Sequence, residues 1–290
     1  MIIKVKYTTW EIINIRGIIS IYKEFSVNIL LCTDGSITSI QTAMLVSEFK
    51  FHPDTRIVVL GVSGNNDDVE KIITSMTQIE VYLSSKNVVS RKIRHGSAIE
   101  EIFNEALENK YDLVAVGGGG AQLGLLRPQV GTTTKKLARK LHTHFLIGRN
   151  IPEKIGKILF CVGGAAPVSE TIRLGGEWTS RINAQFGLLH VIPTSKDNTS
   201  IGAEISKQGD RIISQSLQEL FDAGIKSKIT SRIKRGLVVD NVLEEIKKGG
   251  YQLLVVGAHY QPGQDRWQGT LLDDITDQLL NLSACSMLII

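Results

Sequence analysis

The sequence predicts an α/β protein built from two tandem doubly wound units, each a five-stranded parallel sheet with helices on both faces. Short apolar runs alternate with amphipathic segments along the chain, which is typical of parallel strands connected by helices. The pattern then repeats, because the spacing of Gly96, Tyr111 and Gly117 recurs at Gly236, Tyr251 and Gly257. The chain therefore contains two copies of one unit of about 130 residues.

The composition is that of a globular protein and argues against a nucleic-acid or membrane role. Of the 290 residues, 42% are hydrophobic and 21% charged, which is enough for one large or two ordinary domains. A net charge of +4 is too small to indicate nucleic acid as the main partner. No apolar run approaches the ~18 residues of a membrane span. Glu11, Arg16 and Glu24 interrupt the apolar N-terminus, so we expect no cleaved signal peptide and a cytoplasmic location.

The three cysteines favour a reducing compartment. Cys32, Cys161 and Cys285 show no CxxC spacing, and each lies in an apolar segment. We therefore expect buried thiols and no zinc site.

Residues 1–25 lie outside the repeat and are predicted to be an N-terminal extension. The alternation at Ile2–Tyr7 and the isoleucine-rich stretch Ile12–Tyr22 fit either strands or a packed arm. The first domain is predicted over residues 26–150 and the second over residues 155–290. Asn150, Pro152 and Gly156 mark the linker between them.

The first half of the first unit begins with a buried strand. Asn28–Thr33 is continuously apolar, which predicts burial on both faces of the sheet. Asp34–Ser36 then turns the chain into a helix over Ser39–Phe49, followed by a strand over Arg56–Val62. Apolar residues recur at helical spacing over Asp67–Ser84, so this segment is predicted to be an amphipathic helix.

The second half of this unit supplies the remaining three strands. Val88–Arg94 is predicted as a strand with interleaved basic residues, and Ser97–Glu108 as a helix with one apolar face. Leu113–Val116 is the fourth strand. Leu137 and Leu141 are spaced by one helical turn, which predicts a helix over Thr132–Leu141, and His144–Ile147 is the fifth strand.

The second unit repeats these elements. Lys157–Cys161 corresponds to the first strand, Tyr251–Val256 to the fourth and Ser286–Ile289 to the last. Basic residues alternate along the third strand at Lys226, Lys228, Arg232 and Lys234. A nucleic-acid patch is one interpretation of these residues; the one we favour is charge that discourages pairing with other chains.

A glycine-rich segment stands out between the fourth strand and the next helix of the first unit. Gly117–Gly120 follow the apolar run directly, and Gly131 with Thr132–Thr134 opens the helix. Glycines let backbone N–H groups approach an anion, and a helix N-terminus adds unpaired donors and partial positive charge. The same pattern also occurs as a plain strand-to-helix connection. Neither GxGxxG nor GxxxxGK[ST] matches.

These residues resemble the universal stress protein family, here in tandem. The resemblance rests on the first strand ending in Thr33–Ser36, on the strand DLVAVG and on the glycine loop closed by Gly131 and Thr132. Family members that bind ATP carry G-x2-G-x9-G-[ST] at this loop. The resemblance implies an ATP site, with magnesium, in the first unit. It also implies that the basic third strand lies at the edge of its sheet, and that His144–Ile147 and Ser286–Ile289 pair antiparallel, which makes the chain an intramolecular pseudo-dimer.

The resemblance assigns the sugar and base end of the site to the first two strands. Asp34, next to Thr33, would hydrogen-bond the ribose or the nearby adenine edge, and the backbone of Val62 would meet adenine. The plainer alternative for Asp34 is a turn residue that caps the following helix.

The phosphate end falls on the glycine loop. By resemblance, Gly117 and Gly120 would approach ribose and phosphate, whereas Gly131, Thr132 and Thr134 would hold the phosphates at the start of the helix.

Two departures from the family pattern bear on the site. The loop that ends at Gly131 is one residue longer than the motif when counted from Gly120. In the second unit, Gly163 stands where the first has Asp34, and Tyr260 replaces the second glycine. The second unit is therefore predicted to have no nucleotide site.

Two function classes follow. The first is a stress-response regulatory protein that binds ATP or another adenine nucleotide in the first unit, with at most slow hydrolysis and no assigned catalytic residue. The second is an interaction or scaffold module of the same fold without nucleotide. His142 and His144 are read as ordinary histidines and not as metal ligands. A protein partner is expected but not identified, and a homodimer is left open.

Overall fold

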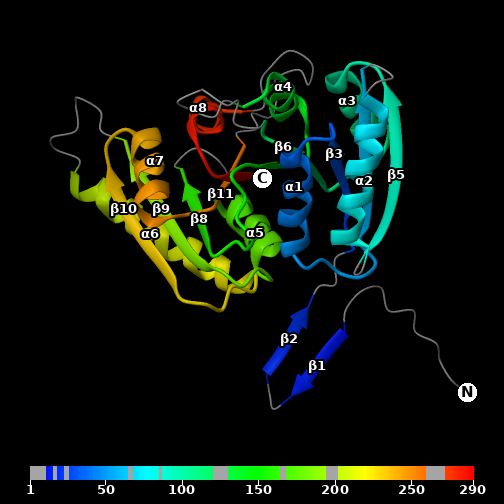
Figure 1. Cartoon of the computed structure of the whole chain (residues 1–290). Coiled ribbons are helices and arrows are strands. Elements are labelled where there is room, and N and C mark those ends of the chain that lie inside the picture. The colour runs from blue at the N-terminus through cyan, green and yellow to red at the C-terminus, as the bar shows by residue number, and fades with distance from the viewer. Residues whose placement is uncertain are drawn as a thin grey trace, which may run out of the picture.

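The computed structural model describes residues 11–15, 18–22, 26–64, 68–84, 87–119, 130–163, 168–193, 202–258 and 272–290. Ten strands form one sheet in the order β10-β9-β8-β11-β12-β7-β6-β3-β4-β5, and each half of this sheet is parallel. The two units therefore stand side by side with mirrored strand orders (Figure 1). This arrangement confirms the predicted fold class of two five-stranded parallel units.

The first unit contains the elements expected from the sequence. They are β3 (Asn28–Thr33), α1 (Ile37–Glu48), β4 (Arg56–Ser63), α2 (Val69–Leu83), β5 (Val88–His95), α3 (Ala98–Glu108), β6 (Leu113–Gly117), α4 (Thr132–Lys140) and β7 (His144–Gly148).

The second unit repeats the series. Its elements are β8 (Lys157–Val162), α5 (Val168–Thr179), β9 (Gln185–Ile192), α6 (Gly202–Asp222), β10 (Ile229–Arg235), α7 (Val238–Gly249), β11 (Leu253–Val256), α8 (Asp274–Leu282) and β12 (Ser286–Ile289).

The segment before the repeat contains a separate hairpin. β1 (Glu11–Ile15) and β2 (Ile18–Tyr22) pair antiparallel as a two-stranded sheet of their own. Of the two interpretations of this segment, the structure shows strands.

Helices bury both faces of the sheet. The central strand β3 is apolar along its length, and Ile29, Leu30 and Leu31 are all fully buried. Ile29 and Leu31 join one core with α1, α2, α5 and α6, whereas Leu30 and Cys32 join a second core with α3, α4, α7 and α8. Burial on both faces explains why this strand shows no alternation of polar residues.

The two units meet through their last strands. β7 and β12 pair antiparallel, with Leu146 opposite Leu288, as predicted. On one face, Arg139 of α4 makes two hydrogen bonds of 2.8 Å to the carboxylate of Asp277 in α8. On the other face, the ring of Trp178 packs edge-on against Phe49 and Phe51 of the first unit. The seam is thus apolar at its centre, with an ion pair on one face and an aromatic cluster on the other.

Buried carboxylates hold the basic residues of both edge strands. In the first unit, Glu105 is 1% exposed and binds Lys92 and Arg94 of β5. In the second, Glu245 is 2% exposed and binds Arg232 and Lys234 of β10. β5 and β10 are the two ends of the sheet, which is the edge position expected for these charged strands.

The seam should be necessary for the stability of the whole chain. Leu288 is fully buried at the centre of the β7–β12 pair, so Leu288→Ala should lower the free energy of unfolding by about 2–5 kcal/mol. Leu282→Ala is the matched control, because Leu282 lies nearby on α8 but is 48% exposed. Urea denaturation followed by circular dichroism measures both variants. Equal losses in the two variants would contradict the proposed role of the seam.

The Glu105 cluster should give the protein a pH-dependent contribution to stability. Burial raises the pKa of Glu105, but hydrogen bonds from Lys92, Tyr111 and Arg94 outweigh it, so this pKa lies below its ordinary value. A lowered pKa stabilises the fold above the unfolded-state pKa of about 4.3, and the contribution disappears as pH falls through the folded-state pKa. In urea denaturation, Glu105→Gln should be destabilised at neutral pH, with the difference from wild type shrinking in acid.

Glu100→Gln is the control for this effect, because Glu100 is exposed on the same helix. A difference between Glu105→Gln and wild type that stays constant from neutral pH to pH about 3 would contradict the assignment.

Candidate functional site

The predicted site residues gather where the strand order changes direction. β3 pairs with β4 on one side and with β6 on the other, so the chain leaves the carboxyl ends of β3 and β6 on opposite faces of the sheet. Ligands of open parallel sheets bind at such switch points. Leu31 lies opposite Ala115, which places Asp34 and Gly117 along the same edge of the sheet.

The turn after β3 is fixed by its own side chains. Asp34 is exposed, and its Oδ1 accepts a hydrogen bond of 2.9 Å from the backbone N–H of Ser36. Gly35 has φ +79°, a conformation that favours glycine. Ser36 then caps α1 by accepting from the N–H of Ser39. One carboxylate oxygen of Asp34 thus shapes the turn, as the plainer interpretation expected, but Ser36, not Asp34, caps the following helix.

Thr33 faces the protein interior. It is 5% exposed, and its hydroxyl lies 2.7 Å from the hydroxyls of both Ser39 and Ser75. This buried hydrogen-bond network links β3 to α1 and α2, so the Thr33 side chain stabilises the turn from the protein interior. Val62 lies next to the end of β4 and is half-buried, opposite Arg94 of β5.

The end of β6 approaches the start of α1 closely. A Cβ on Gly117 would lie 3.3 Å from the backbone nitrogen of Ser39, so this position has little room for a larger residue. Gly118 continues the edge: its N–H donates to the carbonyl of Gly148, and its carbonyl accepts from Gly131 at 3.3 Å. Gly120 lies outside the described residues.

The N-terminus of α4 is open. Gly131 is its N-cap residue, no side chain caps it and its first turn contains no acid. Among the residues that the structure describes, no atom would lie within 4 Å of a Cβ added to Gly131. Thr132 is exposed at the first helical position. The first turn therefore offers N–H groups, a hydroxyl and the positive end of the helix dipole to an anion.

Thr134 has a different contact. It is 5% exposed, and its hydroxyl donates to the carbonyl of Gly117 at 3.0 Å. This bond uses the single hydroxyl proton and ties α4 to the end of β6. In the structure, Thr134 therefore positions the helix, while Thr132 and the backbone face the open side.

In the second unit, an aspartate caps the N-terminus of the corresponding helix, α8. The carboxylate of Asp273 caps α8 by accepting from the N–H of Thr276 at 2.6 Å, and Asp274 and Asp277 lie in the first turn. Thr276 donates to the carbonyl of Gly257, the same link that Thr134 makes to Gly117. The two units thus share a framework but present opposite charge at this helix end.

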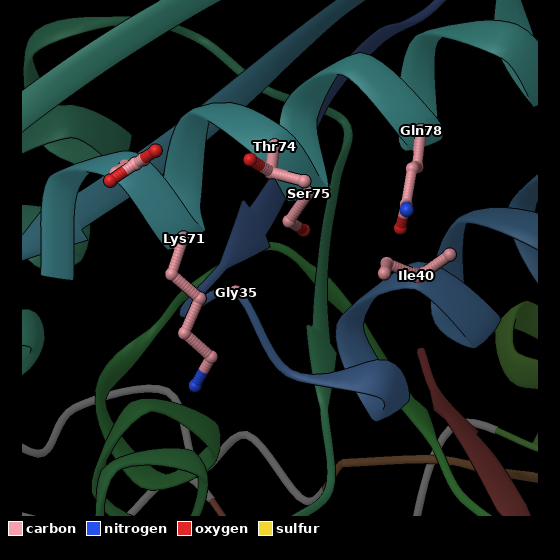
Figure 2. A pocket seen from close by; sticks show the side chains of 7 residues that line it. Gly35, Ile40, Lys71, Thr74, Ser75 and Gln78 are labelled. Atoms are coloured by element: carbon pink, nitrogen blue, oxygen red, sulfur yellow. The ribbon is translucent and has the colours of Figure 1, made fainter.

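A hollow of about 380 Å³ lies beside the turn after β3, and it was not found from the sequence. Figure 2 shows it between α1 and α2, with Ile40 on one side and Thr74, Ser75 and Gln78 on the other. Lys71 runs past Gly35, and its Cγ would lie 2.7 Å from a Cβ at that position. The sequence pattern that could have indicated this hollow is a polar stripe along α2, because Lys71, Thr74, Ser75 and Gln78 recur at helical spacing.

The described part of the chain shows neither a metal-binding cluster nor a membrane-spanning helix. Within the described ranges, no group of three or more His, Cys, Asp or Glu side chains could hold a metal ion. In the same part of the chain, no helix is both long and apolar enough to cross a membrane.

Comparison with protein-family models settles the family of the second unit. Residues 154–290 match the model described as Universal stress protein family. The second half of the chain belongs to the universal stress protein family. The first half is a second copy of the same fold, so the chain is a tandem of two units of one fold.

Solved structures share this tandem fold. A universal stress protein from Archaeoglobus fulgidus is 14% identical, with a TM-score of 0.64 over 91% of this chain and 98% of that one. A protein from Pseudomonas aeruginosa described as a universal stress protein is also 14% identical, with a TM-score of 0.70 over 92% and 94%. The cytoplasmic domain of a prokaryotic cation chloride cotransporter is 11% identical, with a TM-score of 0.53 over 91% and 95%. A search of curated proteins gives no match.

Proposed function

We propose that this universal-stress-type protein binds an adenine nucleotide, ATP, in its first unit and acts as a stress-response regulator with little or no hydrolysis. The observation that supports this proposal is the N-terminus of α4, where, within the described part of the chain, no side chain caps the first turn and no atom would lie within 4 Å of a Cβ on Gly131. Unpaired N–H groups at a helix start need a partner, and a phosphate group satisfies several of them at once.

The contrast with α8 supports a single site per chain. A carboxylate already occupies the α8 N-terminus, since Asp273 caps it and Asp274 adds negative charge, while Asp277 is paired with Arg139. A phosphate there would meet like charge at short range, which is unfavourable. At α4, by contrast, Lys135 and Lys136 follow the first residues of the helix. We therefore place the phosphates at Gly131 and Thr132, with Gly117 and Gly120 along the approach.

The sugar and base would extend from there across the end of β3. The carboxylate of Asp34 is exposed and keeps Oδ2 outside its turn, so it can accept from a ribose hydroxyl. Adenine would then lie toward the backbone of Val62 and the hollow beside Gly35. Ile40 offers that hollow an apolar surface and Gln78 an amide that can pair with the base edge.

A binding role fits these residues better than rapid turnover. Among the proposed site residues, Asp34 is the one carboxylate, and its Oδ1 is held by the N–H of Ser36. Its place is at the sugar end, away from the proposed phosphate position. We therefore propose that magnesium enters with the nucleotide phosphates and that hydrolysis is slow.

The alternative is an interaction module of the same fold that binds no nucleotide. The observation that favours it is the loop before Gly131, which is one residue longer than the family's ATP-binding motif. The following experiment separates the two functions.

Gly131→Val should abolish ATP binding while the fold stays intact. Gly131 has φ −58° and ψ 147°, which valine also adopts, and the added Cβ meets open space, so the fold should tolerate the change. The branched side chain would instead occupy the space in front of the α4 N–H groups. Isothermal titration calorimetry with ATP and magnesium measures the loss, and circular dichroism checks the fold.

Gly163→Val is the matched control, because Gly163 follows β8 in the second unit and, among the described residues, a Cβ there would also have no atom within 4 Å. It should bind ATP as wild type does. If wild-type protein binds no ATP, ADP or AMP at millimolar concentration, the nucleotide proposal is wrong and the interaction module remains.

A further inference from the structure

Arg149 is a buried cation at the junction of the two units. It follows β7 directly and is 4% exposed. Its backbone N–H and carbonyl both bond the hydroxyl of Ser286, and its Nη1 donates to the carbonyl of Ser283 at the end of α8. Nη2 is also buried and has no hydrogen-bond partner among the described residues.

The charge of this guanidinium has no counter-charge among the residues that the structure describes. No carboxylate within the described ranges forms an ion pair with Arg149, and its charged end contacts a neutral carbonyl. Burial lowers the pKa of Arg149 to about 10, which still leaves it protonated at neutral pH. Buried charges are rarely left unpaired, because desolvation of an ion costs several kcal/mol. An anionic group of a bound ligand would supply the missing counter-charge of Arg149.

The side chain of Arg149 lies across the glycine turn of the proposed phosphate site. A Cβ on Gly118 would lie 2.5 Å from Cγ and 2.8 Å from Nε of Arg149. The carbonyl of the same Gly118 accepts from the N–H of Gly131, the N-cap residue of α4. Gly118 therefore lies between the side chain of Arg149 and the N-terminus of α4. Arg149 itself is buried, and a full positive charge with little contact to water attracts a nearby anion more strongly than an exposed one.

This feature belongs to the first unit. In the second, Ala258 takes the place of Gly118, since its N–H donates to Ile290 as that of Gly118 does to Gly148. The methyl group of Ala258 would fill the space that Arg149 uses in the first unit. The same chain thus combines an open helix end with a buried cation in one unit and an acid-capped helix end with an alanine in the other.

We propose that Arg149 supplies the buried positive charge for the phosphates bound at the glycine turn, and that it determines the preference for phosphorylated nucleotide over nucleoside. This inference rests on the proposed nucleotide site. Arg149 acts there as a specificity-determining residue through its charge and through the position of Gly118, whereas Thr132 and the N–H groups of α4 make the direct contacts.

The test compares the affinities of wild type and Arg149→Met for ATP, ADP, AMP and adenosine by calorimetry. Methionine keeps the stem over Gly118 and removes the charge. ATP binding should weaken by about tenfold or more while adenosine binding stays within about twofold, because the lost interaction depends on ligand charge. Arg149→Lys keeps a positive charge and should restore most of the ATP affinity. Gly118→Ala should reproduce the methionine effect by displacing the side chain of Arg149.

Arg139→Met is the matched control, since Arg139 also joins the two units but lies away from Gly118. Its ratio of ATP to adenosine affinity should equal that of wild type. An unchanged ratio in Arg149→Met, or an equal loss for ATP and adenosine, would overturn the proposal while leaving the nucleotide site in place. Absence of nucleotide binding by wild type would overturn both. If Arg149→Met does not fold, the ratio of ATP to adenosine affinity in Arg149→Lys and Gly118→Ala tests the proposal instead.

Discussion

The antiparallel pairing of β7 with β12 is the contact on which the rest of the structure depends. Each unit alone would end in an apolar strand with unpaired N–H and C=O groups, which is a site for aggregation. Joining the two strands satisfies these groups and merges two sheets into one. The same contact brings α4 beside α8, where Arg139 meets Asp277. It also places Ser283 and Ser286 around Arg149, so burial of that cation is a consequence of the seam.

Within this shared framework, the two units differ at one helix end. Thr134 and Thr276 make the same bond to a glycine carbonyl, so the helices α4 and α8 start in the same position relative to their strands. The difference lies in the cap residue, which is Gly131 in one unit and Asp273 in the other. A carboxylate in the cap satisfies the free N–H groups from within the chain, whereas glycine leaves them for a ligand. The two units thus share their packing and differ in whether this helix end is capped from within the chain.

The sequence was sufficient for the sheet and insufficient for the direction of side chains. Continuous apolar runs identified β3 and β6 because both faces of those strands are buried, and the family resemblance supplied the β7–β12 pairing. The inward direction of Thr134 depends on how α4 is rotated against β6, which spacing does not encode. No sequence pattern indicated Arg149, which precedes the linker residue Asn150, because its main side-chain contact is with Ser283, far along the chain. The hydroxyl network of Thr33 was missed for the same reason.

The central claim is that the open end of α4 makes the first unit the single nucleotide site of this chain. Native mass spectrometry of the purified protein with ATP and magnesium tests it most directly, because it counts bound ligands per chain. The account predicts one ATP per chain at saturation for wild type and none for Gly131→Val. Two ATP molecules per chain, or one that persists in Gly131→Val, would contradict it.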